Sequence, residues 1–111
     1  MARWNIIFFP PSGARHSPVD TLKSIAQSSA QALIMRRLGT IGQLEIGDWP
    51  HWVKMVSHIH QLTAGDYRVY FGLVERTIVV CHICRKVGQK AKKSDLGTAT
   101  ANLNNYRDST R

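Results

Sequence analysis

The segment from residue 53 to residue 84 constrains the fold most, because three β-rich stretches follow one another there with very short connections. Val53–Leu62, Tyr67–Leu73 and Thr77–Cys84 are rich in β-branched and aromatic residues. The connections are the segments 63–66 and 74–76. Connections this short join antiparallel strands, whereas a parallel crossover needs a much longer one. The sequence therefore predicts a three-stranded antiparallel meander over residues 53–84.

A strand and a first helix are predicted ahead of the meander. Arg3–Phe9 is β-rich, and the prolines and glycine of residues 10–13 end it. Ser17 is a helix N-cap candidate, because Pro18 suits the first helical position and Asp20 follows three residues after the serine. A helix is therefore expected to begin at this point.

A second helix is expected from the Ser28–Ser29 pair, with Gly39 or Gly42 ending it. Both helices carry apolar residues at intervals of three and four, which predicts one apolar stripe on each. These residues are Val19, Leu22, Ile25 and Ala26 in the first helix, and Ala30, Leu33, Ile34, Leu38 and Ile41 in the second. The two helices should pack as a hairpin on the sheet.

A cationic stretch, residues 85–93, follows the meander and carries Arg85, Lys86, Lys90, Lys92 and Lys93. Ser94–Asp95 then predicts the start of a weak helix that runs toward Tyr106. The expected order is β-α-α-β-β-β-α. The expected fold class is α+β, with two N-terminal helices packed on a twisted antiparallel sheet in a single domain over residues 1–111.

Charge and size limit what this domain can do. The chain has 111 residues, a formal net charge of +8 and a pI near 10.1. This size excludes a large two-domain enzyme, and the charge points to a polyanionic partner. The apolar run Ile6–Phe9 is too short for a membrane span or a signal peptide. With Cys81 and Cys84 as its cysteines, the chain is expected to be cytoplasmic, with reduced thiols and no membrane partner.

The alternation of side chains along a strand groups the candidate chemical residues. If residues 53–62 form one strand, His58 and His60 share a face with Lys54. Arg68 and Tyr70 should share the face opposite Val69 and Phe71, which pack on the helices, and so look outward or into a cleft. Together with the cationic stretch, these imidazoles and cations form the set of groups that metal-free RNA cleavage needs. The alternative is that they are solvated residues that only contact phosphate.

The Cys81-His82-Ile83-Cys84 segment has the C-x-x-C spacing of zinc and redox motifs. In an extended strand, however, Cys81 and Cys84 should point to opposite faces, where one metal ion could not reach both. The sequence therefore predicts structural thiols in a buried strand and no metal site.

Residues Ser17 to Tyr106 resemble the RelE/ParE toxin superfamily of bacterial toxin-antitoxin modules, most closely its phage-derived, HigB-like branch. The strand Tyr67–Phe71 is the most diagnostic piece of this resemblance. The full set of motifs is Pro18-Val19-Asp20, Ile34-Met35-Arg36-Arg37-Leu38, Gly65-Asp66-Tyr67-Arg68-Val69-Tyr70-Phe71, and Arg85-Lys86 through Gln89-Lys90 to Lys92-Lys93-Ser94-Asp95. The resemblance implies a RelE-like microbial RNase fold.

The resemblance also implies a growth-inhibiting toxin that enters the ribosomal A site and cleaves the translated mRNA without a metal ion. Arg68 matches the family arginine that contacts the scissile phosphate, and His58 and His60 stand where many relatives have basic residues. The segment around Lys86 and Lys90 matches further catalytic cations. Residues 94–97 lack the Tyr or His that several ribosome-dependent members carry there, so the general base stays open.

Residue roles follow from these two lines of reasoning. The predicted catalytic residues are Arg68, His60, His58 and Lys90, and the predicted RNA-binding residues are Lys54, Tyr70, Arg85, Lys86, Lys92 and Lys93. No cofactor is expected. The expected partners are the ribosome, mRNA and a cognate antitoxin, the last a small helix-turn-helix protein. Two alternatives stay open: a ParE-like poison of DNA gyrase without nuclease activity, and an inactive RNA-binding relative.

Overall fold

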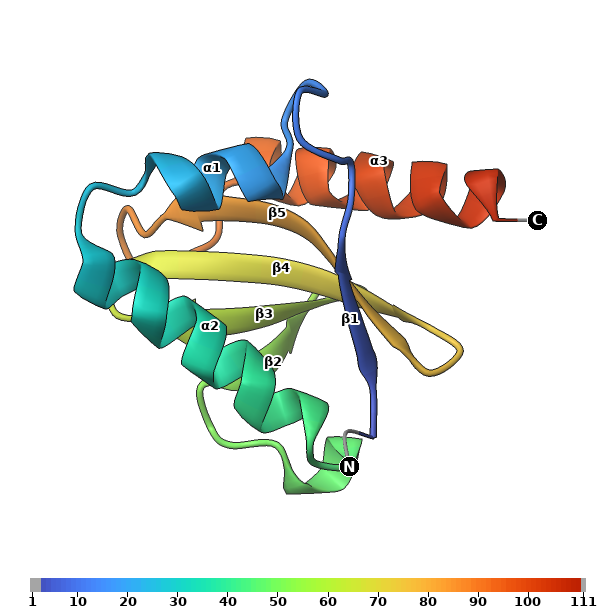
Figure 1. Cartoon of the computed structure of the whole chain (residues 1–111), viewed down its shortest axis with the longest axis horizontal. Coiled ribbons are helices and arrows are strands. Elements are labelled where there is room, and N and C mark those ends of the chain that lie inside the picture. Colours follow the sequence, from blue (N-terminus) through green and yellow to red (C-terminus); the bar gives the residue numbers. More distant parts are fainter. Residues whose placement is uncertain (1–2, 111) are drawn as a thin grey trace.

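The computed structural model of the chain describes residues 3–110 and has the predicted α+β class (Figure 1). The elements, in chain order, are β1 (Asn5–Phe8), α1 (Pro18–Ser24), α2 (Ser28–Gly42), the short 3-10 helix η1 (Ile46–Asp48), β2 (Val53–Val56), β3 (Ile59–Ala64), β4 (Tyr67–Val74), β5 (Thr77–Arg85) and α3 (Lys93–Ser109). Both N-terminal helices form where their patterns predict them.

Local sequence explains how α1 and α2 begin. The Ser17 hydroxyl accepts a hydrogen bond from the Asp20 amide at 3.4 Å, and Pro18 occupies the first turn of α1. The helix α2 begins at Ser28 without a side-chain cap and ends at Gly42, the second of the two predicted stops. The predicted start of α1 is therefore confirmed, although α1 ends at Ser24, before Ile25 and Ala26 of its predicted stripe. The predicted cap of α2 at Ser28–Ser29 is wrong, because Gln27 is the N-cap residue.

The sheet has the strand order β1-β5-β4-β3-β2. Adjacent strands from β2 to β5 are antiparallel, as predicted, but β1 pairs with β5 in parallel, with Asn5 opposite Thr77 and Phe8 opposite Val80. The prediction of a wholly antiparallel sheet is therefore wrong at this edge. A parallel neighbour is possible because a long connection, including both helices, separates β1 from β5.

The predicted single strand over residues 53–62 is also wrong, because the chain reverses in the middle of it. Val56 pairs with Ile59, so Ser57 and His58 form a two-residue turn between β2 and β3. Ser57 adopts a left-handed conformation with φ of 58°, as tight hairpin turns require. The observed order is thus β-α-α-β-β-β-β-α, with one strand more than predicted.

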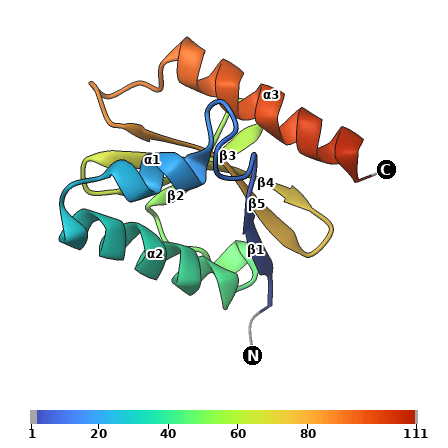
Figure 2. The same cartoon turned by 45° about the horizontal axis from the view of Figure 1, so that its top comes forward.

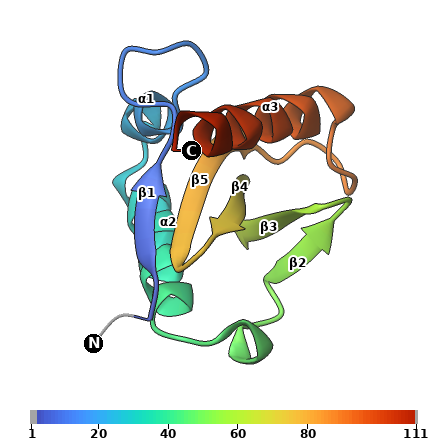
Figure 3. The same ribbon diagram turned by 90° about the vertical axis from the view of Figure 1, so that its right-hand side faces the viewer.

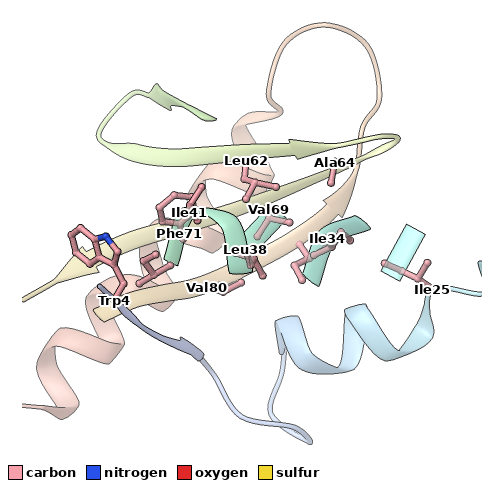
Figure 4. Close-up of a cluster of buried hydrophobic side chains, with 12 residues drawn as sticks. Trp4, Ile25, Ile34, Leu38, Ile41, Leu62, Ala64, Val69, Phe71 and Val80 are labelled. Carbon is pink, nitrogen blue, oxygen red and sulfur yellow. The ribbon is translucent and has the colours of Figure 1, made fainter. Parts of the chain in front are cut away.

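The helices α1 and α2 cover one face of the sheet. On this face Val69 and Phe71 are fully buried against residues of α2, which confirms the predicted packing (Figure 4). The buried residues of this cluster are Trp4, Ile25, Ile34, Leu38, Ile41, Leu62, Ala64, Val69, Phe71, Ile78, Val80 and Ile83.

The helix α3 covers the opposite face (Figures 2 and 3). Its residues Ala99 and Leu103 pack with Ile59, Tyr70, Val79 and Cys81 in a second, smaller cluster. The amide of Asn102 donates a 2.9 Å hydrogen bond to the Cys81 carbonyl, which fixes the helix on β5. The sheet therefore lies between two helical layers, and the cationic stretch connects β5 to the second layer. Among residues 3–110, no helix is both long and apolar enough to cross a membrane.

Candidate functional site

The face of the sheet beneath α3 carries a row of polar side chains across four strands. The pairings between neighbouring strands align Lys54 with Gln61, Gln61 with Tyr70, and Tyr70 with His82. A neighbouring row contains Arg68, whose partner on β5 is Cys84. We call residues 86–92, which join β5 to α3 and pass over these rows, the cationic loop.

Arg68 is buried beneath the cationic loop, with 4% of its surface exposed. Its guanidinium donates hydrogen bonds to the main-chain carbonyls of Gly88 at 3.0 Å, Gln89 at 2.9 Å and Lys90 at 3.1 Å. Its Nε is buried without a hydrogen-bond partner among the described residues. The expectation that Arg68 looks outward or into a cleft is therefore wrong, because the loop folds back over the sheet and its carbonyls take up the guanidinium.

Tyr70 is fully buried as well, and the structure does not offer its ring to RNA. Its hydroxyl donates a 3.1 Å hydrogen bond to Oε1 of Gln61. Burial raises the pKa of Tyr70 to about 12, so the phenol stays protonated. Tyr70 thus fixes the position of the Gln61 side chain through this hydrogen bond.

Lys54 and Lys90 line one open cleft, although they lie far apart in the sequence. The cleft has a volume of about 370 Å³ and lies between β2, β3 and the cationic loop. Its lining residues are Lys54, Met55, Val56, Gln61, Gln89, Lys90 and Ala91. Two exposed lysines and two glutamines therefore line this cleft, without an imidazole or a carboxylate in the lining.

The other predicted RNA-binding cations lie outside the lining of this cleft, and Arg85 lines a different pocket beside Asp66 and Tyr67. Arg85 ends β5, Lys86 and Lys92 lie in the cationic loop, and Lys93 begins α3. All four are exposed. The structure thus keeps these side chains accessible, as phosphate contacts require.

His58 and His60 do not lie on one face of the sheet, contrary to the sequence-based expectation. His58 lies on the side of α3, where it lines a separate pocket with Ile59 and residues of α3. His58 lies in the exposed β2–β3 turn, where its Nδ1 is 3.1 Å from the Ser57 hydroxyl. His60 lies on the α2 side, stacked on Phe71 with ring centroids 5.1 Å apart and edge-on to Trp49. Burial lowers the pKa of His60. The turn at residues 57–58 is the cause, because it breaks the alternation that the prediction assumed.

The prediction that Cys81 and Cys84 point to opposite faces is wrong too. The pairing of β4 with β5 shifts between Tyr70 and Phe71, which places an extra residue, Cys81, in β5. Cys81 and Cys84 consequently both lie on the α3 side. Both thiols are free. Cys81 is fully buried, donates to the Tyr70 carbonyl at 3.4 Å, and has a pKa raised to about 12 by burial, which agrees with a structural thiol.

Sequence reasoning missed a polar cluster formed by His82, Cys84 and Asp95. The Nε2 of His82 lies 2.8 Å from Oδ1 of Asp95, which joins β5 to the first turn of α3. Burial, together with the neighbouring Asp95 carboxylate, raises the pKa of the Cys84 thiol to about 12. The sequence signal for this cluster was the histidine inside the C-x-x-C segment, but the aspartate looked like part of a helix cap.

Comparisons with known proteins add no relative: no family model matches the chain, and no curated protein does.

Proposed function

We propose that the protein is the toxin of a type II toxin-antitoxin module, with a RelE-like microbial RNase fold, and that it cleaves mRNA on the ribosome without a metal ion. The observation that carries this proposal is the cleft that Lys54 and Lys90 both line, bounded by a loop that the Arg68 guanidinium anchors. The net charge of +8 and the resemblance to the RelE/ParE superfamily support the same function.

The chemistry proposed for the cleft needs two cations at one phosphate. The 2′-oxygen of the RNA attacks the adjacent phosphorus, and the bond from phosphorus to the 5′-oxygen breaks. Lys54 and Lys90 are placed to hold the phosphate and to stabilise the negative charge that develops on it. Water in the open cleft accepts the proton of the 2′-hydroxyl, and one of the two ammonium groups donates a proton to the leaving 5′-oxygen.

This assignment changes the roles that the sequence suggested. Arg68 becomes a positioning residue, because its guanidinium reaches the loop carbonyls and not the cleft surface. His60 leaves the proposed site because it lies on the opposite face of the sheet. Arg85, Lys86, Lys92 and Lys93 are proposed to hold the flanking RNA backbone, each through its exposed cation.

The proposed antitoxin acts on the same surface. A chain of charge +8 favours an acidic partner, which would cover the cleft and repel RNA from it. A small helix-turn-helix antitoxin with an acidic segment satisfies this requirement. In a complex of the two proteins, Lys54 and Lys90 should become inaccessible.

The alternative function is binding without cleavage, by a gyrase poison or an inactive RNA-binding relative. The observation that favours it is the composition of the cleft, which has no imidazole or carboxylate in its lining. The burial of Arg68 and Tyr70 points the same way, because neither side chain is free to touch a phosphate.

Expression in a bacterium distinguishes these functions. The wild type should stop growth and produce new mRNA 5′ ends within translated regions, while Lys54→Ala and Lys90→Ala should do so weakly. Lys23→Ala removes one exposed lysine from α1 and serves as the matched control, with wild-type cleavage. If growth stops without new mRNA ends and gyrase-linked DNA breaks appear, the proposed nuclease function is wrong and the protein is a gyrase poison. If the wild type causes neither growth arrest nor mRNA cleavage, the protein is an inactive RNA-binding relative.

A further inference from the structure

His82, Cys84 and Asp95 place three different ligand atoms around one point beneath the cationic loop. The histidine nitrogen, the cysteine sulfur and a carboxylate oxygen all lie within 4.8 Å of one another. The side chains of His82 and Asp95 are 13% and 22% exposed, so the cluster is shielded but still reachable from solvent.

These separations are close to what a tetrahedral zinc ion requires. Bonds of roughly 2.0–2.3 Å to nitrogen, oxygen and sulfur place neighbouring ligand atoms roughly 3.3–3.6 Å apart. The nitrogen of His82 and the oxygen of Asp95 are now 2.8 Å apart, so they need to separate by less than an ångström. The Cys84 sulfur lies within 4.8 Å of both atoms, so a side-chain rotation that brings it about an ångström closer would complete three corners of the tetrahedron.

The identity of the donors selects the metal. A thiolate with an imidazole suits zinc, whereas magnesium and calcium prefer oxygen ligands throughout. The charges also balance, because a thiolate and a carboxylate together neutralise a dication. Burial and the Asp95 carboxylate raise the pKa of the Cys84 thiol, so the ion has to displace the thiol proton when it binds.

We propose that His82, Cys84 and Asp95 form a Zn²⁺ site with three protein ligands and a fourth position open to water. The ligands come from the end of β5 and the first turn of α3, so the ion would hold both ends of the cationic loop. As the sulfur–zinc bond forms, the Cys84 thiol releases its proton to solvent. The hydrogen bond between His82 and Asp95 breaks, and the imidazole proton moves from Nε2 to Nδ1, so that the nitrogen and the carboxylate oxygen can both bind the ion. The site does not depend on the proposed nuclease activity.

The experiment uses the full chain, stripped of metal by a chelator and titrated with Co²⁺ as a spectroscopic probe. A one-to-one complex should show a thiolate-to-cobalt charge-transfer band in the near ultraviolet and the intense visible bands of tetrahedral cobalt. Added Zn²⁺ should remove both. Calorimetric titration of Zn²⁺ in buffers of different ionisation enthalpy should show release of about one proton per ion. Absence of the charge-transfer band, or a stoichiometry of one ion per two chains, would overturn the site.

Variants assign the ligands. Cys84→Ser should abolish the charge-transfer band, and Asp95→Asn should weaken Zn²⁺ binding by more than about a hundredfold, since a direct ligand is lost. Cys81→Ala is the matched control, because it removes the other thiol, which lies outside the cluster, and should keep the band. Circular dichroism verifies that each variant is folded. If Cys81→Ala loses the band while Cys84→Ser keeps it, the proposed ligand set is wrong. Since these readouts use no RNA, their failure leaves the proposed function untouched.

Discussion

The guanidinium of Arg68 donates a 3.1 Å hydrogen bond to the main-chain carbonyl of Lys90. The buried Arg68 therefore fixes the backbone of Lys90, whose own side chain is exposed. The two residues occupy different layers, with Arg68 beneath the loop and Lys90 on its surface. Loss of Arg68 should therefore reach the cleft indirectly, through the position of Lys90.

Arg68→Ala is expected to destabilise the fold and to loosen the cationic loop. Charge-assisted hydrogen bonds contribute roughly 1.5–3 kcal/mol each, but burying the arginine offsets part of this, so we expect a loss of about 2–4 kcal/mol. Urea unfolding measures the loss, and amide hydrogen exchange should increase in residues 86–92. Arg85→Ala removes an exposed arginine nearby and should change stability by less than about 0.5 kcal/mol. Unchanged unfolding and exchange in Arg68→Ala would refute the anchoring role.

Binding to single-stranded RNA should depend strongly on salt, and the cleft lysines should account for part of that dependence. Each phosphate contact contributes about 0.7 to the slope of log affinity against log salt concentration. Lys54→Ala and Lys90→Ala should each reduce the slope by about this amount, while Lys23→Ala on α1 should not. Fluorescence anisotropy at several salt concentrations measures the slopes. Equal slopes for all four proteins would remove the cleft from the RNA-binding surface.

His60 should make the fold sensitive to mild acid. Burial lowers its pKa below the ordinary value of 6.5, so the unfolded chain binds the proton more tightly than the folded one. Stability therefore falls as the pH drops through about 6.5. His60→Phe, which keeps a ring on Phe71, should lose less stability than wild type between about pH 7.5 and about pH 5.5. Thermal unfolding at both pH values tests this.

His58→Gln, in the exposed turn, is the control for that experiment and should behave as wild type does. Because His60 lies away from the cleft, folded His60→Phe should also retain RNA cleavage. If His60→Phe loses RNA cleavage but keeps its stability, His60 is a catalytic residue after all.

Gly72 leaves the space that α3 needs on β4. A β-carbon at this position would collide with Cδ2 of Leu103, which is itself buried. Gly72→Ala should therefore destabilise the fold by about 1–3 kcal/mol through overpacking. Gly97→Ala is the matched comparison, since its β-carbon meets nothing within 4 Å and alanine favours the helix, with an expected gain of up to about 1 kcal/mol. Denaturant unfolding of both variants measures the contrast.

The sequence was informative wherever a local pattern determines structure. The cap at Ser17, the stripes of α1 and α2 and the β-rich strands β4 and β5 all led to correct elements. The β2–β3 turn was not predicted, because Ser57 and His58 are not the Asn-Gly or Asp-Gly pair that is typical of tight hairpins. The prediction that His58 and His60 share a face depended on an unbroken strand there, and it was wrong because His60 lies on the α2 side.

The candidate site was less predictable than the fold because long-range pairing creates it. Lys54 and Lys90 were both selected by charge, but only the fold of the loop brings them into one cleft. The burial of Arg68 depends on carbonyls from residues 88–90, which no residue pattern reveals. The bulge at Cys81 likewise reverses the expected geometry of the cysteines without a sequence signal.

The parallel pairing of β1 with β5 also governs the order in which a nascent chain can mature. The first strand to leave the ribosome contains Ile6, Ile7 and Phe8, and its ladder needs residues 77–80, which are synthesised much later. Until then this apolar strand stays unpaired, a state that invites association with other chains. A chain that terminates early consequently lacks its sheet edge and the cleft alike, so premature products are expected to be cleared by proteolysis rather than released as partly competent molecules.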